Sequence, residues 1–282
     1  KKKCLNNRDL NGYVLELVKL NPIWNNIKNL TIMQKLKNNI YFKIGTIVII
    51  TLLLLIPTAM IKDLILERES TQNEAIREVS SKWGEEQTIS GPFISIPYYK
   101  YVKEISKKDS TEKIVKFKEY LHILPSELNI SGSIKPEKRY RGIYEIVVYN
   151  SNLLLNGAFN SFDFSTIDVP HKDIQFHMAE FVVGINDLRG IEKQVKLDWN
   201  ENEVSFNPGV TSRDVVYNGI NASIDIDPMD SANYNFSLDL DLKGSQLLYF
   251  TPVGKITDIN LNSEWSNPSF NGAFLPDERN VS

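Results

Sequence analysis

The feature that most constrains this chain is an unbroken apolar run, IGTIVIITLLLLIPTAMI, at residues 44–61. At about 1.5 Å of rise per helical residue it extends roughly 27 Å, and residues 40–42 lengthen it enough to cross a bilayer core of about 30 Å. A buried helix of a soluble domain is the alternative, but such helices are rarely apolar on every face. A cleaved signal peptide is disfavoured because the run is too long and 43 residues precede it. We therefore predict one transmembrane helix over residues 44–61.

The charges on the two sides of this run are unequal. Residues 1–43 contain nine Lys or Arg and two acidic residues, a balance of +7, so the total of −3 leaves −3 − 7 = −10 on the rest of the chain. Positive segments stay on the cytoplasmic side of a membrane, which predicts a cytoplasmic N-terminus and places residues 62–282 in the periplasm or extracellular space. Within residues 1–43 the pattern fits either an amphipathic helix on the membrane surface or a disordered basic tail.

The residues after the apolar run favour a continued helix. Residues 62–84, KDLILERESTQNEAIREVSSKWG, contain strong helix formers, no proline and a glycine at the end. Ile76, Val79 and Trp83 fall on one face of such a helix. We predict that the membrane helix continues as a helical stalk over 62–84, with its last turns docked on the next domain.

From residue 85 to residue 276 the pattern is that of β-strands. Short runs of strand-forming residues alternate with turn clusters such as Asn207-Pro208-Gly209 and Asp227-Pro228. The expected strands are 91–101, 114–124, 144–159, 174–183, 195–199, 214–226, 234–242, 246–250 and 256–262, with 101–113 as a polar hairpin tip. The fold class predicted is a mainly β exported domain, antiparallel and sandwich-like, after a transmembrane helix that continues as a stalk. Cys4, the one cysteine, excludes a disulfide in this domain.

The residue types that carry chemistry form no specific pattern. His122 lies in an alternating strand, and His171 and His177, with Asp173 and Glu180 nearby, do not have a metal-ligand spacing. The acidic groups Asp225, Asp227 and Asp230, and Asp239 with Asp241, lack the features of a calcium loop and are interpreted as solvent faces of strands. We predict no catalytic, cofactor-binding or metal-binding residue, no enzyme activity and no cofactor. An acidic exported domain also argues against nucleic acid as a partner.

Several Gly, Pro and aromatic motifs recur along the chain, and most of them are typical of turns and core packing. In order they are Trp83-Gly84, Gln87 with Gly91-Pro92 and Pro97-Tyr98, Arg141-Gly142-Ile143-Tyr144 running to Val148-Tyr149, Gly157 with Phe159, Leu188-Arg189-Gly190, Gly244-Ser245, Pro252-x-Gly254, and Trp265-x-x-Pro268-Ser269-Phe270-x-Gly272 before Leu275-Pro276. This ordered series resembles the CreD family of bacterial inner-membrane proteins over residues 62–280.

The resemblance implies a cell-envelope integrity protein of the bacterial inner membrane, linked in some bacteria to a stress response, with a periplasmic domain followed by further membrane helices. On that basis we predict a non-catalytic structural or stress-response role, with the lipid bilayer and other envelope proteins as partners. Two alternatives stay open: a periplasmic ligand-binding, lipid-binding or sensor module, and an envelope enzyme or transport component whose active part lies in C-terminal helices. Residues 277–282 are expected to begin a linker in a longer natural chain.

Overall fold

The computed structural model describes residues 40–105, 112–160, 164, 169–227, 233–265, 268–273 and 277–278. The expectations for residues 1–39, for the hairpin tip at 106–111, for Asp230 and for residues 274–276 and 279–282 lie outside these residues. The chain divides into two compact units, one ending at Thr71 and one beginning at Gln72. Each unit is described by itself.

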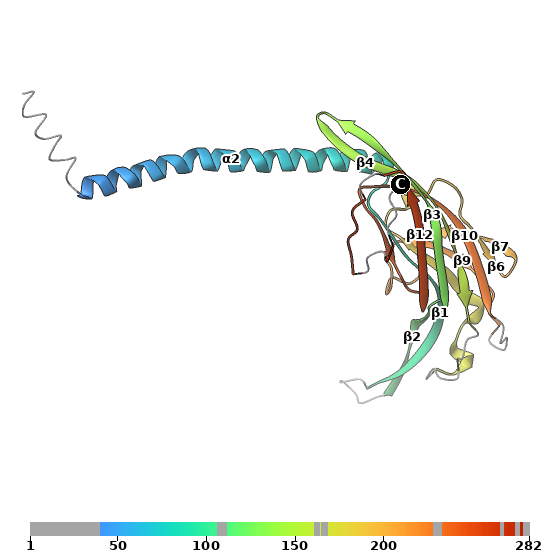
Figure 1. The fold of residues 1–282 in the computed structure, drawn as a ribbon. Coiled ribbons are helices and arrows are strands. Elements are labelled where there is room, and N and C mark those ends of the chain that lie inside the picture. The colour runs from blue at the N-terminus through green and yellow to red at the C-terminus, as the bar shows by residue number, and fades with distance from the viewer. Residues whose placement is uncertain are drawn as a thin grey trace, which may run out of the picture. The chain divides into compact units, whose positions relative to one another are not determined.

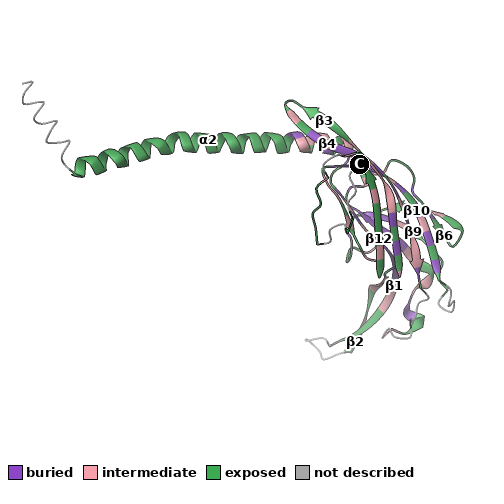
Figure 2. Cartoon of the chain, in the orientation of Figure 1, coloured by how far each residue is buried: buried purple, intermediate pink, exposed green. Residues whose placement is uncertain are grey.

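The first described element is one long helix, α2 (Ile40–Trp83), of 44 residues. It is the one helix of the described residues that is long and apolar enough to cross a membrane, and its apolar part is exposed on all sides (Figures 1 and 2). Thr46, Thr51 and Thr58 each donate a hydrogen bond to the carbonyl oxygen four residues earlier. These bonds satisfy the three hydroxyls within the helix, as a lipid environment requires.

The last turns of α2 belong to the second unit and pack on its sheets. Gly84 ends the helix, as the sequence predicts: its φ is +155° and its N–H donates to Ser80 O at 2.8 Å. A Cβ at Gly84 would lie 2.7 Å from Lys243 O, so no side chain fits. The predicted face is the buried one, and the apolar cluster there consists of Ala75, Ile76, Val79 and Trp83 with Tyr144, Ile146 and Val148.

Two six-stranded sheets form the rest of the second unit (Figure 1). Sheet A contains β1 (Gln87–Ile105), β2 (Glu112–Ile123), β5 (Glu180–Ile185), β8 (Asn207–Pro208), β9 (Gly219–Ser223) and β11 (Leu248–Thr251). Sheet B contains β3 (Glu127–Arg141), β4 (Tyr144–Phe159), β6 (Lys196–Trp199), β7 (Asn202–Ser205), β10 (Tyr234–Ser245) and β12 (Ile256–Ser263). The predicted fold class, a long apolar helix followed by a mainly β domain, is confirmed.

The pairing within the sheets is mostly antiparallel, with two exceptions. β1 pairs with β11 in parallel, and β12 pairs with β3 in parallel. The strand order is β11-β1-β5-β9-β8 in sheet A, with β2 also on β1, and β12-β3-β4-β10-β6-β7 in sheet B. The last two strands of the sequence, β11 and β12, therefore lie at sheet edges, parallel to β1 and β3 from the first half of the domain. These parallel pairs make both sheets mixed.

The main core lies between the two sheets. It contains residues of β1, β5 and β9 from sheet A together with residues of β3, β4 and β10 from sheet B in one cluster. Phe181 of β5 meets Phe236 of β10 with ring centroids 5.2 Å apart, and Phe159 of β4 at 6.1 Å. Face-to-face packing of aromatic and aliphatic side chains from both sheets is what makes this unit a sandwich.

Several strand predictions need correction. Residues 101–105 and 112–113, expected in a polar hairpin tip, belong to β1 and β2. Residues 174–179 are not strand: the 3-10 turns η2 (His171–Asp173) and η3 (Phe176–Met178) satisfy the local backbone, and β5 begins only at Glu180. The strand expected over 214–226 is limited to β9. Conversely β3, at residues 127–141, was not predicted, because Pro136 and its Ser and Gly residues obscure the alternation. Pro136 lies beyond Ile134, where the pairing with β12 ends, so a missing amide donor is tolerated there.

Candidate functional site

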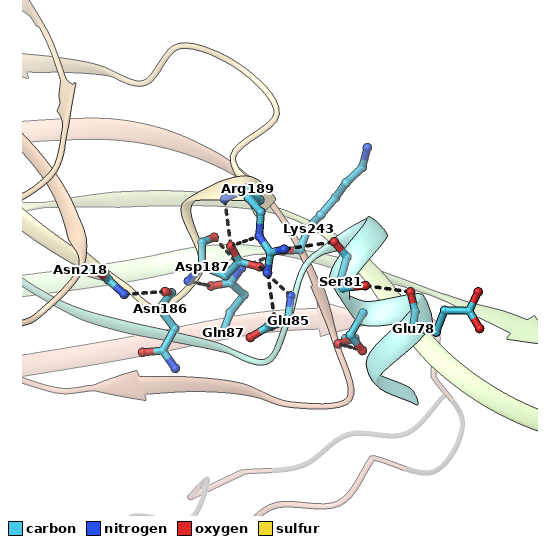
Figure 3. A network of polar contacts seen from close by, with 11 residues as sticks. Glu78, Ser81, Glu85, Gln87, Asn186, Asp187, Arg189, Asn218 and Lys243 are labelled. Atoms are coloured by element: carbon cyan, nitrogen blue, oxygen red, sulfur yellow. Dashed lines mark hydrogen bonds and ion pairs between the residues drawn. The ribbon is translucent and has the colours of Figure 1, made fainter. Parts of the chain in front are cut away.

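The residues that converge most in this fold meet where α2 joins the two sheets. They come from distant parts of the sequence: Trp83-Gly84, Gln87, Tyr149, Leu188-Arg189-Gly190 and Gly244-Ser245. Figure 3 shows the polar contacts around Gln87, Asp187 and Arg189. We call this region the junction. It consists of the last turns of α2, the start of β1, the turn η4 (Leu188–Gly190), the end of β10 and the middle of β4.

Asp187 is the central acceptor of the junction. Its side chain is only 10% exposed. One carboxylate oxygen accepts from the Arg189 backbone N–H at 3.1 Å and from Arg189 Nε at 2.8 Å, and the other accepts from Glu85 N at 3.0 Å and Arg189 Nη2 at 2.9 Å. The Asp187 carboxylate therefore closes the η4 turn and also joins this turn to Glu85, which follows α2.

Arg189 extends this network to the helix. Its Nη1 donates to Ser81 O at 3.1 Å, and its Nη2 donates to Glu85 Oε1 at 2.8 Å (Figure 3). The last carbonyl groups of an α-helix lack partners within the helix and carry the negative end of its dipole. A guanidinium donor at Ser81 O satisfies one of these carbonyls and complements the dipole.

Gln87 holds three backbone segments together from a fully buried position. Its Nε2 donates to Asp187 O and to Lys243 O, both at 3.0 Å, and its Oε1 accepts from Asp187 N at 3.2 Å. Gly190 makes this approach possible, because a Cβ there would lie 2.3 Å from Lys243 O and 2.6 Å from Gln87 Nε2. The amide of Gln87 thus fixes β1, the η4 turn and β10 at one point.

A second set of contacts holds the helix itself. Trp83 Nε1 donates to Tyr149 O at 3.2 Å, and Ser245 Oγ donates to Ser80 Oγ at 2.8 Å. The Trp83 ring has the Arg139 guanidinium and the Lys243 ammonium each 4.8 Å from its centroid. These cation–π contacts and the two hydrogen bonds fix the end of α2 against β4 and β10.

The charges of the junction are stabilised in their ionised forms. Burial by itself raises the pKa of Asp187, but the hydrogen bonds from Arg189 and from Glu85 N outweigh it, and the pKa lies below its ordinary value. The hydrogen bonds to Asp187 and Glu85 raise the pKa of Arg189. Burial raises the pKa of the Tyr149 hydroxyl, which donates to Leu247 O at 2.8 Å. The side chains of Asp187, Arg189 and Gln87 thus have structural partners that hold the elements of the junction together.

A protein-family model described as inner membrane protein CreD matches residues 39–282. This chain belongs to the CreD family. It is 29% identical over 249 residues to the inner membrane protein CreD of Escherichia coli (strain K12), an alignment that covers 88% of this chain and 54% of that protein. The chain therefore spans about half the length of this curated relative.

In this CreD-family chain the histidines weighed from the sequence do not come together. His122 lies on β2, where its Nε2 is 3.0 Å from Asp214 Oδ2. His171 and His177 lie on the exposed turns η2 and η3. Among the described residues, no group of three or more His, Cys, Asp or Glu side chains is arranged to hold a metal ion.

Asp239 and Asp241 follow the strand pattern that the sequence indicates, whereas Asp225 and Asp227, also expected on a strand, lie beyond the end of β9. Asp239 is exposed on β10 between the buried Leu238 and Leu240. Asp241 is half-buried and contacts Lys193 Nζ at 2.6 Å and Asn152 Nδ2 at 2.6 Å, so its outer-face position holds a local ion pair. Asp225 and Asp227 are exposed.

The motifs quoted from the sequence contain most glycines and aromatic residues of the CreD junction but not its central acceptor, Asp187. Gln87, Arg189, Gly190 and Gly244 belong to the motifs quoted above, whereas Asp187 and Glu85 do not. The one local signal for Asp187 is its position two residues before Arg189, where its carboxylate closes the η4 turn as an N-cap.

Proposed function

We propose that this chain is the membrane-anchored portion of a CreD-family protein whose β domain lies in the periplasm and has a non-catalytic structural or stress-response role in the cell envelope. In this proposal residues 1–43 are cytoplasmic, 44–61 cross the inner membrane, 62–84 form a helical stalk, 85–276 form the periplasmic domain and 277–282 begin a linker. The charge difference of +7 against −10 supports this orientation.

The observation that carries the proposed role is the junction. Asp187, Arg189 and Gln87 join the end of α2 to both sheets through side chains that are fully engaged with one another and with backbone groups. A domain held in this way transmits force or displacement between its sheets and the helix without needing a reactive group. The junction therefore supports a scaffold or mechanical coupling role over the alternatives of a ligand-binding module or an enzyme.

The orientation predicts a clear difference between two cysteine positions. In intact cells with a permeabilised outer membrane, a membrane-impermeant maleimide should label Tyr217→Cys, a substitution at a position 79% exposed in the β domain, in a Cys4→Ser background. The native Cys4 should be labelled only after the inner membrane is disrupted. Labelling of Cys4 but not of Tyr217→Cys in intact cells would reverse the proposed topology.

The structural role predicts which substitutions reduce the stress resistance that this chain confers on cells. In a strain that lacks its own copy, a chain carrying His122→Gln, His171→Gln and His177→Gln together should restore resistance to detergent and osmotic stress as well as the wild type does. Arg189→Ala should restore it poorly, because the helix end loses the donor to Ser81 O and the ion pair to Glu85. Protein levels are compared by immunoblot. The reverse pattern, in which the histidine variant fails and Arg189→Ala is active, would contradict a non-catalytic role.

A further inference from the structure

The second unit carries one feature that its core does not explain, the outer part of the β1–β2 hairpin. We call the arm the paired segments Tyr99–Ile105 and Glu112–Lys118, whose register runs from Tyr99 opposite Lys118 to Ile105 opposite Glu112. Tyr98, Leu121 and Ile123 are the outermost residues of this hairpin that pack on the main core. Within the described part of the chain β2 pairs with β1 alone and Tyr99–Ile105 pair with β2 alone, so the arm projects from sheet A as a two-stranded ribbon (Figure 1).

Four large apolar side chains of the arm are exposed. Tyr101 is 52% exposed, Ile114 63%, Phe117 41% and Val102 38%. By the register, Tyr101 and Ile114 share one face of this two-stranded arm and Val102 and Phe117 share the other, and Figure 2 colours most of the described outer hairpin as exposed. A soluble protein rarely leaves such a group of aromatic and aliphatic side chains without a partner.

The arm is also positively charged on an acidic domain. It contains five lysines, Lys100, Lys103, Lys113, Lys116 and Lys118, against Glu104 and Glu112, a balance of 5 − 2 = +3. Since residues 44–282 carry −10, the remainder of that segment carries −10 − 3 = −13. The sign of the charge therefore changes where the core ends.

Three of these five lysines are not paired with a carboxylate among the described residues. Lys103 lies 3.5 Å from Glu112, and Lys100 lies 3.6 Å from Glu119. Across the described residues no ion pair joins Lys113, Lys116 or Lys118 to a carboxylate; instead the ammonium groups of Lys116 and Lys118 lie over the rings of Tyr99 and Tyr120. Lysines that rest on aromatic rings present their charge at the surface together with apolar area.

We propose that the arm binds the headgroup surface of an anionic phospholipid bilayer. Lysines interleaved with Tyr, Phe and aliphatic side chains are the composition of segments that lie in the membrane interface. A glycan partner is disfavoured because the two segments contain no Asn, Gln, Asp, Ser or Thr to bond sugar hydroxyls. Pairing of β2 with the β2 of a second copy is disfavoured, because the lysines on the β2 strand of one copy would repel those on the other.

The membrane helix strengthens this contact. A bilayer-spanning segment in the same chain tethers the arm to a membrane, and a tether raises the effective concentration of lipid wherever its length lets the two meet. Each lysine close to an anionic surface strengthens binding roughly fivefold. The proposal does not depend on the side of the membrane on which the β domain lies, so it is separate from the topology proposed above.

The test uses the full chain reconstituted in nanodiscs, with an environment-sensitive fluorophore on Ile114→Cys in a Cys4→Ser background. Emission should shift to shorter wavelength when phosphatidylglycerol is added to phosphatidylcholine discs, and high salt should reverse the shift. The same fluorophore on Tyr217→Cys, away from the arm, should report no change. Equal emission from the Ile114 label in neutral and anionic discs would overturn the proposal.

Charge-reversal variants then distinguish lipid binding from a general change in charge. The triple variant Lys113→Glu, Lys116→Glu and Lys118→Glu should lose the shift, whereas the matched triple variant Lys135→Glu, Lys172→Glu and Lys255→Glu, at exposed positions outside the arm, should keep it. Near-UV circular dichroism confirms that both variants are folded. A shift produced in neutral discs by soluble polyglutamate, or one that survives in the arm variant, would assign the arm to another kind of partner and overturn the proposal.

Discussion

Replacing Phe181 with alanine is expected to lower the free energy of unfolding of the β domain by about 4 kcal/mol, within the range for large aromatic residues removed from a core. Phe181 is fully buried on β5 of sheet A. Its ring centroid lies about 6 Å or less from those of three aromatic residues on sheet B, Phe159, Trp199 and Phe236. The ring of Phe206, which follows β7, lies at a similar distance. The loss is large because the two sheets cannot close around the cavity without moving apart from their other contacts.

The measurement is urea unfolding of the full chain in detergent, followed by the near-ultraviolet circular dichroism of Trp199 and its neighbours. Trp199 is a suitable probe because it packs on Phe181 at 5.9 Å and stacks on Tyr234 at 5.2 Å. Phe117→Ala, the same substitution at an exposed position of the arm, should change the unfolding free energy by less than about 0.5 kcal/mol. Equal losses for the two variants would show that Phe181 does not join the sheets.

The parts of the fold that sequence reasoning predicted are those with a strong local pattern. Residues 234–242 alternate apolar and polar side chains, and in β10 Leu238, Leu240 and Leu242 are buried while Asp239 is exposed. The helix over 44–61 needed only an uninterrupted apolar composition, in spite of Pro57, and its continuation over 62–84 needed only helix formers, absence of proline and a terminal glycine. An alternation of period two or an unbroken apolar run involves only residues that are close in sequence. Such a pattern therefore indicates its element without knowledge of the partner strands.

The parts that were missed depend on distant partners. The parallel pairing of β12 with β3 joins residues more than a hundred positions apart, from Ile256 opposite Glu127 onward, and no local period indicates it. β3 itself breaks its alternation with Gly132 and Pro136. Gly132 is required because a Cβ there would lie 2.2 Å from Asn152 O on β4, a close approach that only the folded hairpin reveals.

Part of the junction stands out in the sequence because some of its residues are constrained in type. Its glycines and Gln87 stand out as motifs, because a missing Cβ or a buried amide imposes a strong demand on residue type. Asp187 does not stand out, since its acceptor role is defined by Glu85, 102 residues earlier. An exposed-looking Asp-x-Arg sequence becomes the centre of the site only when β1 and α2 are brought to it.

Asp187→Ala is accordingly expected to lower the free energy of unfolding by about 3 kcal/mol. The substitution removes the charged acceptor of the Glu85 and Arg189 N–H groups, and a hydrogen bond to a charged group contributes about 1.5–3 kcal/mol. Arg189 also loses the carboxylate that positions it against Ser81 O. The control is Asp239→Ala on an exposed position of β10, for which a change below about 0.5 kcal/mol is expected. A loss for Asp187→Ala no larger than that of the control would mean that the network adds nothing to stability.

Asp187→Asn separates the charge from the hydrogen bonds. Because the pKa of Asp187 is lowered in the folded protein, its ionised form contributes stability that is present above the unfolded-state value of about 3.9 and is lost as the pH falls through the folded-state value. The wild type should therefore exceed Asp187→Asn in unfolding free energy at neutral pH, and this difference should narrow below about pH 4. Glu78, Glu119, Glu145 and Asp241 also have lowered pKa values, so acid sensitivity of the wild type alone does not identify Asp187. The difference between the two curves does identify it, because those four groups are common to both proteins. A difference that stays constant from neutral pH down to pH values below about 3 would show that the carboxylate acts at the junction by shape and not by charge.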